Sequence, residues 1–320
     1  MELHWKWLII VYLFLGGLGA GAYLTSYAAQ KGWLGKSPAL NKAGYFIAAP
    51  VVAAGTVLLV FDLGQGLRKP WLLIGLILNP RSVMTWGVYI LAAFILVGLV
   101  AAYFAWKNAK APSALVNAGA VLALGTGAYT GMLIAVVKAI PFWNNYLTPV
   151  LFVVSALSTG MSATLLLAHF MEKGKAMDEA KLNKIHLGLV VAELVALGAW
   201  LAVPLSGAKG SVAVQSASSL ISGSLAVVFW VVFVGAGLVF PLVVYGINVF
   251  RPAKQAEGVP GLELAVPAVG TVNEIAVSHD TQHSSSVVIL ATDAAVIIGG
   301  FALRTVVILA ALPIWNGALG

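Results

Sequence analysis

The sequence predicts an all-α integral membrane protein with eight transmembrane helices. The chain of 320 residues is 61% hydrophobic and only 9% charged, with a mean hydropathy of +0.98. This composition leaves too little polar surface to cover a soluble globule. A span needs about 20 mainly apolar residues. Eight segments meet that requirement: residues 7–29, 43–63, 82–105, 113–137, 148–170, 186–206, 219–249 and 286–311.

Helices are favoured over strands because the apolar runs are continuous, without the alternation of a membrane β-barrel. The seventh segment, 219–249, is longer than a bilayer requires, so we expect it to be tilted or to extend into water. Residues 251–285 contain RPAKQAEGVPG and show little periodicity. We expect them to form a long loop.

The Lys and Arg residues outside the spans predict the topology, because cytoplasmic loops carry an excess of them. Six lie in one set of alternating loops and the N-terminal tail: Lys6, Arg68, Lys69, Arg81, Lys138 and Lys209. Eleven lie in the other set: Lys31, Lys36, Lys42, Lys107, Lys110, Lys173, Lys175, Lys181, Lys184, Arg251 and Lys254. We therefore expect a multi-pass protein of the cytoplasmic (inner) membrane with both termini extracytoplasmic. No basic stripe with aromatics predicts binding to nucleic acid.

Small residues and a weak repeat indicate how the helices pack. Gly17 and Gly21, in FLGGLGAGAY, have GxxxG spacing, and so do Gly127 and Gly131, in GTGAYTG. Such residues let helix backbones approach closely in lipid. Pro-x-Trp-Asn follows the fourth span in AIPFWNN and the eighth in ALPIWNG. Because four helices separate the copies, we expect two four-helix bundles, spans 1–4 and 5–8, in the same orientation.

Cysteine is absent from the sequence, so the protein cannot itself ligate an iron–sulfur cluster through thiolates. A transmembrane haem needs axial histidines inside spans. His169 and His186 lie at span ends and leave one unfavoured bridging geometry. His279 and His283 have i,i+4 spacing but lie in the expected loop. We expect no haem, no iron–sulfur cluster and no metal site in this protein.

Several motifs together resemble those of a known family: FLGGLGAGAYL, FDLG, NPRSVMTWG, YTGMLIAVVKAIPFWNN followed by PVLFVVSALSTG, and GGFALRTVVILA. The chain resembles the NrfD/PsrC family, the quinone-reactive membrane subunits of nitrite, polysulfide and related reductases. The resemblance covers essentially all eight spans and is strongest over residues 10–165. It implies a bound quinone, menaquinone or ubiquinone, and no haem. It also implies a partner with four iron–sulfur clusters and a molybdopterin or multihaem catalytic subunit. The motifs suggest a division into residues 1–171, with spans 1–5 and the quinone-site motifs, and residues 172–320, with spans 6–8 and the 251–285 loop.

Asp62 is the first candidate for a functional residue. A charged residue inside a membrane costs about 2.5–3.5 kcal/mol on insertion scales and is usually functional. Asp62 ends the second span, with Arg68 and Lys69 close behind it in sequence. We interpret Asp62 as the group that accepts a proton from quinol. The alternative is a structural ion pair at the edge of the bilayer.

Aromatic residues complete the expected quinone site. Tyr129 matches the tyrosine of the family's quinone pocket, and a phenol can donate a hydrogen bond to a ring oxygen. Tyr12 stands where some relatives have histidine; it can donate a hydrogen bond but does not titrate near neutral pH. Trp143 lies on the same predicted outer face. For both Tyr129 and Trp143, the alternative is an ordinary interfacial aromatic.

Arg81, Ser82 and Lys138 also fall on this outer face. Arg81 and Lys138 suit either an acidic surface of the iron–sulfur partner or a negatively charged quinone. The alternative role of such cations is to anchor lipid headgroups. We therefore expect these three residues to lie next to the quinone or the partner.

Three further charges lie deeper in the membrane. Glu193 is in span 6, and Asp293 and Arg304 share one face of span 8 about 16 Å apart. With Asp62 they form a candidate path for protons between the cytoplasm and an outer quinone site. The alternative is a buried charge cluster that fixes the helices together.

These observations predict a membrane anchor subunit of a respiratory oxidoreductase. It would bind a quinone near the extracytoplasmic face, exchange electrons with an iron–sulfur partner and contribute to proton translocation. The main alternative is a secondary transporter built from a parallel two-bundle repeat. A passive structural anchor is a third possibility.

Overall fold

The computed structural model describes residues 3–35, 37–62, 78–79, 82–172, 179–250 and 272–314. Across these ranges the regular structure is entirely helical. Eight of the helices described are long and apolar enough to cross a membrane. The expected fold class is therefore confirmed, and the chain is a multi-pass membrane protein.

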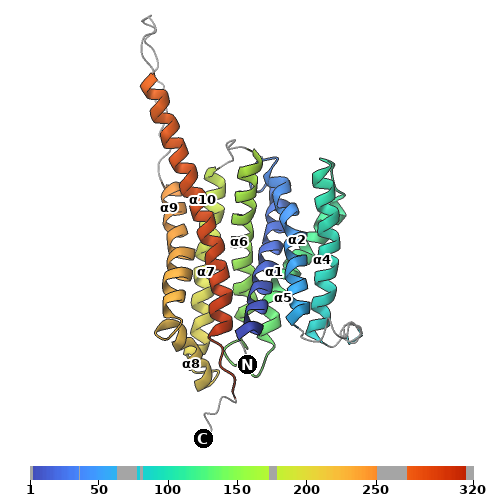
Figure 1. Cartoon of the computed structure of the whole chain (residues 1–320), viewed down its shortest axis with the longest axis vertical. Helices are drawn as coiled ribbons and strands as arrows, with labels where there is room; N and C mark the ends of the chain where they lie inside the picture. Colours follow the sequence, from blue (N-terminus) through green and yellow to red (C-terminus); the bar gives the residue numbers. More distant parts are fainter. Residues whose placement is uncertain are drawn as a thin grey trace, which may run out of the picture.

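The membrane-spanning helices run up and down beside one another (Figure 1). The seventh span consists of a π-helix, η1, that continues directly as α9, and a shorter helix, α8, precedes it. The helices are α1 (Leu3–Gln30), α2 (Leu40–Asp62), α4 (Val83–Trp106), α5 (Ser113–Ala135), α6 (Leu147–Glu172), α7 (Glu179–Leu205), α8 (Ser211–Ile221), η1 (Val228–Val239), α9 (Phe240–Phe250) and α10 (Val272–Leu309).

The segment 219–249 is not one long helix, as its apolar composition suggested. α8 ends at Ile221, and the seventh span begins only at Val228. The intervening Ser222, Gly223 and Ser224 are poor helix formers that favour turns. Two helices therefore account for the excess length.

The expected loop at 251–285 is wrong in its second half, because α10 is helical from Val272 onward. Residues 272–285 contain neither Pro nor Gly to end a helix, but they are polar and lack an apolar period. A sequence reading based on apolar periodicity misses such a helix. The side chains of His279 and His283 lie outside the described residues.

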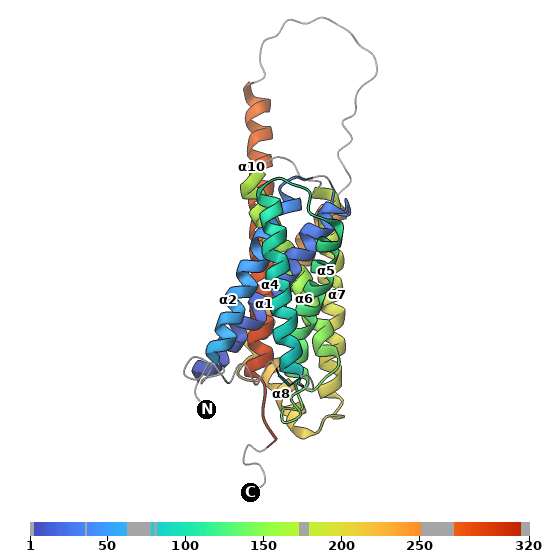
Figure 2. The same ribbon diagram turned by 90° about the vertical axis from the view of Figure 1, so that its right-hand side faces the viewer.

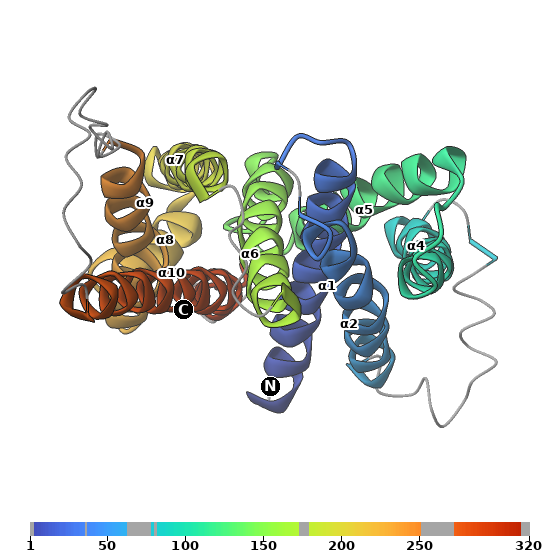
Figure 3. The ribbon, with the colours of Figure 1, turned by 90° about the horizontal axis from the view of Figure 1, so that it is seen from above.

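The two expected four-helix bundles are not confirmed. α1, α2, α4 and α5 pack together on one side, and α7, η1, α9 and α10 pack on the other. α6 lies between these groups and packs against α1, α2 and α5 as well as α7 and α10 (Figure 3). The fifth span thus joins the two groups instead of belonging to one.

α1 and α6 meet along a contact that we call the α1–α6 seam, formed by Gly21, Ala156 and Gly160. A Cβ on Gly21 would overlap the Ala156 carbonyl, and one on Gly160 would overlap the backbone of Gly21. Gly44 of α2 makes an equally close approach to Ala22 of α1. The interpretation of Gly21 as a helix-packing residue is confirmed, because only glycine permits this approach.

The molecule has two ends that differ in charge. We call one end the lysine-rich face; α1, α4 and α6 end there, and α2, α5 and α7 begin there. Its described lysines are Lys31, Lys42, Lys107, Lys110, Lys181 and Lys184. α1 begins and α10 ends at the other end, the opposite face, where α8 also lies (Figure 2).

The two copies of the sequence repeat lie against each other at the opposite face. The Ile314 backbone N–H donates to the Ala139 carbonyl at 3.1 Å. The Trp143 indole N–H donates to the Val307 carbonyl of α10 at 2.8 Å. Trp315 and Asn316 of the second copy lie outside the described residues. The segments after α5 and α10 thereby join the two helix groups at this end.

Candidate functional site

Two buried tyrosines lie in the half of the membrane region nearer the opposite face. Tyr12 of α1 is 0% exposed and Tyr129 of α5 is 5% exposed. They are near enough to interact electrostatically. Sequence reasoning assigned both to one site, and the structure places them close together.

Glycines of two further helices shape this site, which we call the tyrosine–glycine site and define as Tyr12, Gly55, Gly87 and Tyr129. The Tyr129 ring lies directly on the backbone of Gly87 in α4, where a Cβ would overlap the ring. A Cβ on Gly55 of α2 would lie 3.5 Å from Cδ2 of Tyr12. The Tyr129 ring can lie this close to α4 only because Gly87 has no side chain, whereas the distance at Gly55 is an ordinary van der Waals contact with Tyr12.

The Tyr12 hydroxyl is buried and has no hydrogen-bond partner among the residues described. Leaving a buried polar group unpaired costs about 1–3 kcal/mol. Such a group in a native fold calls for an explanation, and a ligand or water that accepts its hydrogen is a common one. An apolar site with one unpaired donor fits a molecule that is largely hydrophobic and carries a carbonyl or hydroxyl oxygen.

Gly127 and Gly131, on either side of Tyr129 in sequence, are not the glycines that make room for its ring. A Cβ on Gly131 would lie 2.5 Å from Cα of Pro149, so Gly131 serves the packing of α5 on α6. At Gly127 a Cβ would make only ordinary contacts, the nearest at 3.8 Å. The close approach to the Tyr129 ring comes instead from Gly87, which sequence reasoning missed. NPRSVMTWG is visible as a motif, but spacing alone could not show which ring its glycine faces.

The remaining candidates of the outer site are only partly described. Asp62 is the last residue of α2, and its side chain, with Arg68, Lys69 and Arg81, lies outside the described residues. Ser82 precedes α4 without a side-chain capping bond. Lys138 is exposed at the opposite face. Trp143 is half-buried, and its indole N–H already donates to the Val307 carbonyl.

A second polar region lies between α6, α7, α9 and α10. Arg304 of α10 is fully buried. Its Nη1 donates to the Ser155 hydroxyl at 2.5 Å and to the Gly300 carbonyl at 2.8 Å, and its Nη2 lies 3.4 Å from the Phe152 carbonyl. The guanidinium carbon also lies 5.2 Å from the Phe152 ring centroid. These contacts orient the cation away from lipid.

Glu193 of α7 is the acidic residue nearest to Arg304 among the groups that interact with it. It is 2% exposed and interacts electrostatically with Arg304. Its carboxyl also lies beside the hydroxyls of Ser155 and Ser158 of α6. No direct ion pair joins Glu193 and Arg304 in the described part of the chain, so their attraction offsets only part of the large cost of burying each of them.

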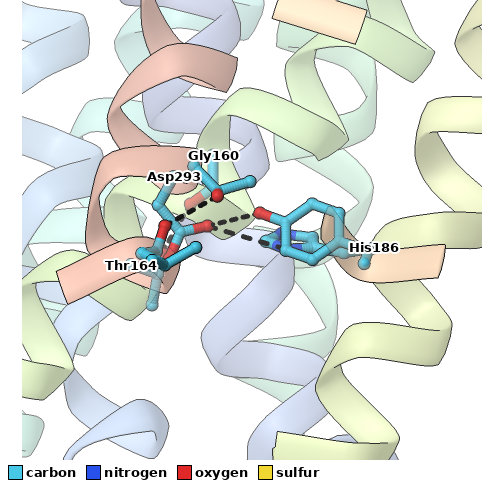
Figure 4. Close-up of polar contacts among 7 residues, drawn as sticks. Gly160, Thr164, His186 and Asp293 are labelled. Carbon is cyan, nitrogen blue, oxygen red and sulfur yellow. Dashed lines mark hydrogen bonds and ion pairs between the residues drawn. The ribbon is translucent and has the colours of Figure 1, made fainter. Parts of the chain in front are cut away.

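Asp293 lies nearer the lysine-rich face, between α6, α7 and α9. Its Oδ1 accepts a hydrogen bond from the Tyr245 hydroxyl at 2.8 Å and lies 3.6 Å from Nδ1 of His186. Figure 4 shows Asp293 between the Gly160–Thr164 turn of α6 and the His186 ring. The Thr164 hydroxyl donates to the Gly160 carbonyl at 2.7 Å. The three members of the Asp293 cluster, Asp293, His186 and Tyr245, are at most 2% exposed.

The structure places Glu193 near Arg304, as one group of the expected set. Asp293 instead contacts His186 and Tyr245. His186 and Tyr245 were not predicted to join it. A signal for His186 was present, because Asn183, His186, Val190 and Glu193 recur at i, i+3, i+7 and i+10 and so share a helix face. All four are buried. Tyr245 lies in the next span, and its partner could not be read from local spacing.

Known proteins resemble the chain over most of its length. A family model described as polysulphide reductase, NrfD, matches residues 1–259. The chain belongs to the NrfD family. The matched part of this NrfD protein includes every helix before α10 and therefore the whole tyrosine–glycine site; Asp293 and Arg304 fall beyond it.

Individual NrfD relatives give the same picture. A polysulfide reductase chain from Wolinella succinogenes is 33% identical over 298 residues, which covers 84% of this protein and 90% of the relative. Protein NrfD of Escherichia coli is 28% identical, and the match covers 83% of this protein and 90% of the relative. A selenate reductase subunit from Mesobacillus selenatarsenatis is 22% identical, covering 83% of this protein and 71% of the relative. Two of these names describe parts of reductases.

Proposed function

We propose that this NrfD protein is the membrane anchor subunit of a respiratory oxidoreductase and that it binds a quinone or quinol at the tyrosine–glycine site. The unpaired hydroxyl of Tyr12, buried beside Tyr129 in an apolar setting, is the observation that carries the proposal. Family membership supports it, since NrfD proteins are known to react with quinones and two similar proteins are named as parts of polysulfide and selenate reductases.

The residues of the site have distinct roles in this proposal. The Tyr12 hydroxyl donates a hydrogen bond to one ring oxygen, and Tyr129, held in place by Gly87, lines the ring and offers a second hydroxyl. A quinol supplies two electrons and two protons when it is oxidised. Asp62, at the end of α2, accepts a proton from it.

Electrons pass to or from a partner at the opposite face. We propose that this partner carries four iron–sulfur clusters and that the complex also includes a molybdopterin or multihaem subunit. Arg81, Ser82, Lys138 and Trp143 are the residues proposed to lie next to the partner or the quinone. In this arrangement the opposite face is extracytoplasmic, both termini lie there, and the lysine-rich face meets the cytoplasm, in accord with the excess of cations.

Protons move separately through the second polar region. Asp293 lies in the half near the lysine-rich face, Glu193 lies near the middle of its span, and Arg304 lies in the half near the opposite face. Arg304 also approaches α1, because a Cβ on Gly17 would lie 3.0 Å from its Nη2. Gly17 is about 7.5 Å along the helix axis from Tyr12. The path from Asp293 through Glu193 and Arg304 therefore leads toward the tyrosine–glycine site.

A binding titration tests the quinone proposal. A short-chain naphthoquinol is added to the purified full-length protein, and tryptophan fluorescence quenching is recorded for wild type, Tyr12→Phe, Tyr129→Phe and Asp62→Asn. We expect saturable binding that weakens about tenfold or more in Tyr12→Phe, which is about 1.4 kcal/mol.

Tyr23→Phe is the matched control. Tyr23 is another fully buried tyrosine of α1, but its hydroxyl donates to the Val116 carbonyl, away from the site. Its removal should leave quinol affinity unchanged. Equal affinities in wild type, Tyr12→Phe and Tyr129→Phe would show that the quinone binds elsewhere, and absence of saturable binding would favour a passive anchor.

A further inference from the structure

The Asp293 cluster has hydrogen-bonding capacity that its internal contacts do not use. One oxygen of Asp293 meets both Tyr245 and His186, and the His186 and Tyr245 rings lie 4.7 Å apart. Nε2 of His186 is nevertheless buried without a partner in the described part of the chain. The hydroxyl of Ser162 lies beside the Asp293 carboxyl but does not form a hydrogen bond of good geometry with a described residue. A site built only to fix helices together would gain by satisfying these groups.

Among the described residues, no cation paired with Asp293 holds it in the ionised state, so its protonation state can change. The groups that face it are Tyr245 from α9, His186 from α7, and Ser162 and Thr164 from α6. No described Lys or Arg makes an ion pair with it. Imidazole and carboxyl can both bind or release a proton, whereas a carboxylate paired to arginine would be held ionised. The cluster can therefore hold one proton more or one fewer.

The depth of the cluster suits exchange with one side of the membrane. Asp293 lies six residues after Val287, where the membrane-spanning part of α10 begins, so it is about 9 Å from that end. Asn183 lies one turn before His186 on the same face of α7 and is 7% exposed. A polar side chain thus lies between His186 and the lysine-rich face.

Hydroxyls of α6 connect the cluster with the deeper charges. Ser155, Ser158 and Ser162 recur at spacings of three and four, so they share one face of α6. Ser162 lies beside Asp293, Ser158 and Ser155 lie beside Glu193, and Ser155 also accepts from Arg304. The Ser158 and Ser162 hydroxyls have no other partners among the described residues and are free to rotate between donors and acceptors.

We propose that His186, Asp293 and Tyr245 form a proton-binding site that exchanges with the lysine-rich face, and that Ser162 and Ser158 connect it to Glu193. The Asp293 carboxylate takes up one proton, with His186 as the group that delivers it. The proton then passes over the serine hydroxyls to the Glu193 carboxylate, and Asp293 is ionised again. This inference rests on the proposed function, because the cluster would supply the inner half of its proton path. Proton binding at the cluster itself does not require a bound quinone.

Infrared spectroscopy can test the site on the full-length protein alone. Difference spectra between alkaline and acidic buffer, with the protein in lipid nanodiscs, report the carbonyl stretch of each carboxyl that becomes protonated. We expect a band that Asp293→Asn removes and that Tyr245→Phe moves in frequency, because Tyr245 donates to the carboxyl oxygen. Glu193→Gln should remove a different band. In His186→Gln we expect hydrogen–deuterium exchange at Asp293 to slow about tenfold or more.

Control variants distinguish a specific effect on the Asp293 cluster from a general effect of substitution. Tyr103→Phe changes an exposed tyrosine of α4 and should alter none of these signals. If Asp293→Asn does not fold, Asp293→Glu retains a carboxyl and must show the band at a new frequency. Retention of the band in Asp293→Asn would overturn the proposal. So would wild-type exchange kinetics in His186→Gln, because a purely structural cluster does not need His186 to deliver protons.

The same samples separate this inference from the quinone proposal. Naphthoquinol binding is titrated beside each spectrum. If the wild-type protein shows the Asp293 band but does not bind naphthoquinol, the quinone site is contradicted and the proton site still stands. If the wild-type protein binds naphthoquinol but shows no Asp293 band, the proton site is contradicted and the quinone site still stands.

Discussion

The tyrosine–glycine site and the polar region around Asp293 and Arg304 lie on the two sides of α6, and they are built differently. In the first, the Tyr129 ring packs directly on the backbone of Gly87, and the described residues of the site carry no charge. The second holds an arginine, two carboxyls and a histidine, all at most 2% exposed. Close packing selects the shape of a ligand, whereas buried charges and rotatable hydroxyls suit the movement of protons. The difference fits our proposals, in which the first region binds the quinone and the second moves protons.

The largest effect should come from the buried cation. Arg304→Met leaves Glu193 without its counter-charge and removes the bonds to Ser155 and Gly300. We expect a loss of about 3–5 kcal/mol in the free energy of unfolding, measured by thermal unfolding in detergent. Adding Glu193→Gln should restore part of it. If Arg304→Met is as stable as wild type, the charges do not stabilise this region and the contrast with the tyrosine–glycine site fails.

The next effect should fall on ligand binding. Gly87→Ala places a methyl group where the Tyr129 ring now lies, so the ring must move. We expect naphthoquinol affinity to fall about tenfold, or 1.4 kcal/mol. Gly127→Ala is the control, because its Cβ would have no contact closer than 3.8 Å. Equal affinities in the two variants would mean that the packing of Tyr129 on α4 does not matter for binding.

A smaller effect should appear where the segments after α5 and α10 join the two helix groups at the opposite face. Trp143→Phe removes the N–H donated to Val307 and keeps the aromatic ring. We expect a loss of about 1 kcal/mol in unfolding free energy, with quinol affinity unchanged if Trp143 only joins α10 to the segment after α5. A tenfold loss of affinity would place Trp143 in the quinone site itself.

The smallest effect should come from Lys138, which is exposed. Lys138→Gln should change the free energy of unfolding by less than about 0.5 kcal/mol. If Lys138 docks the iron–sulfur partner, the variant should instead weaken assembly of the complex, more at low than at high salt. Co-purification at two salt concentrations measures this. Unchanged assembly at both would limit Lys138 to the lipid headgroup region.

Hydrophobic composition was enough to predict the fold class and the positions of the spans. It could not place boundaries where the chain is polar or turn-forming, which is why the start of α10 at Val272 and the break after α8 were missed. Tyr12 and Tyr129 were predicted from their positions in motifs that resemble the NrfD/PsrC family. His186, Tyr245 and Gly87 were not, because their roles arise from contacts between different helices. Spacing along one helix shows which face a residue such as His186 lies on, but not which side chain of another helix it contacts.

The α1–α6 seam bears on the reading of this molecule as a secondary transporter. Alternating access by rocking requires one set of helices to swing against another, opening a gap first on one side of the membrane and then on the other. At Gly21 and Gly160 the backbones of α1 and α6 touch so closely that not even a methyl group fits between them. A swing between the helix groups would pull this contact apart. The seam therefore argues against rocking between these helices and, with it, against the secondary-transporter alternative.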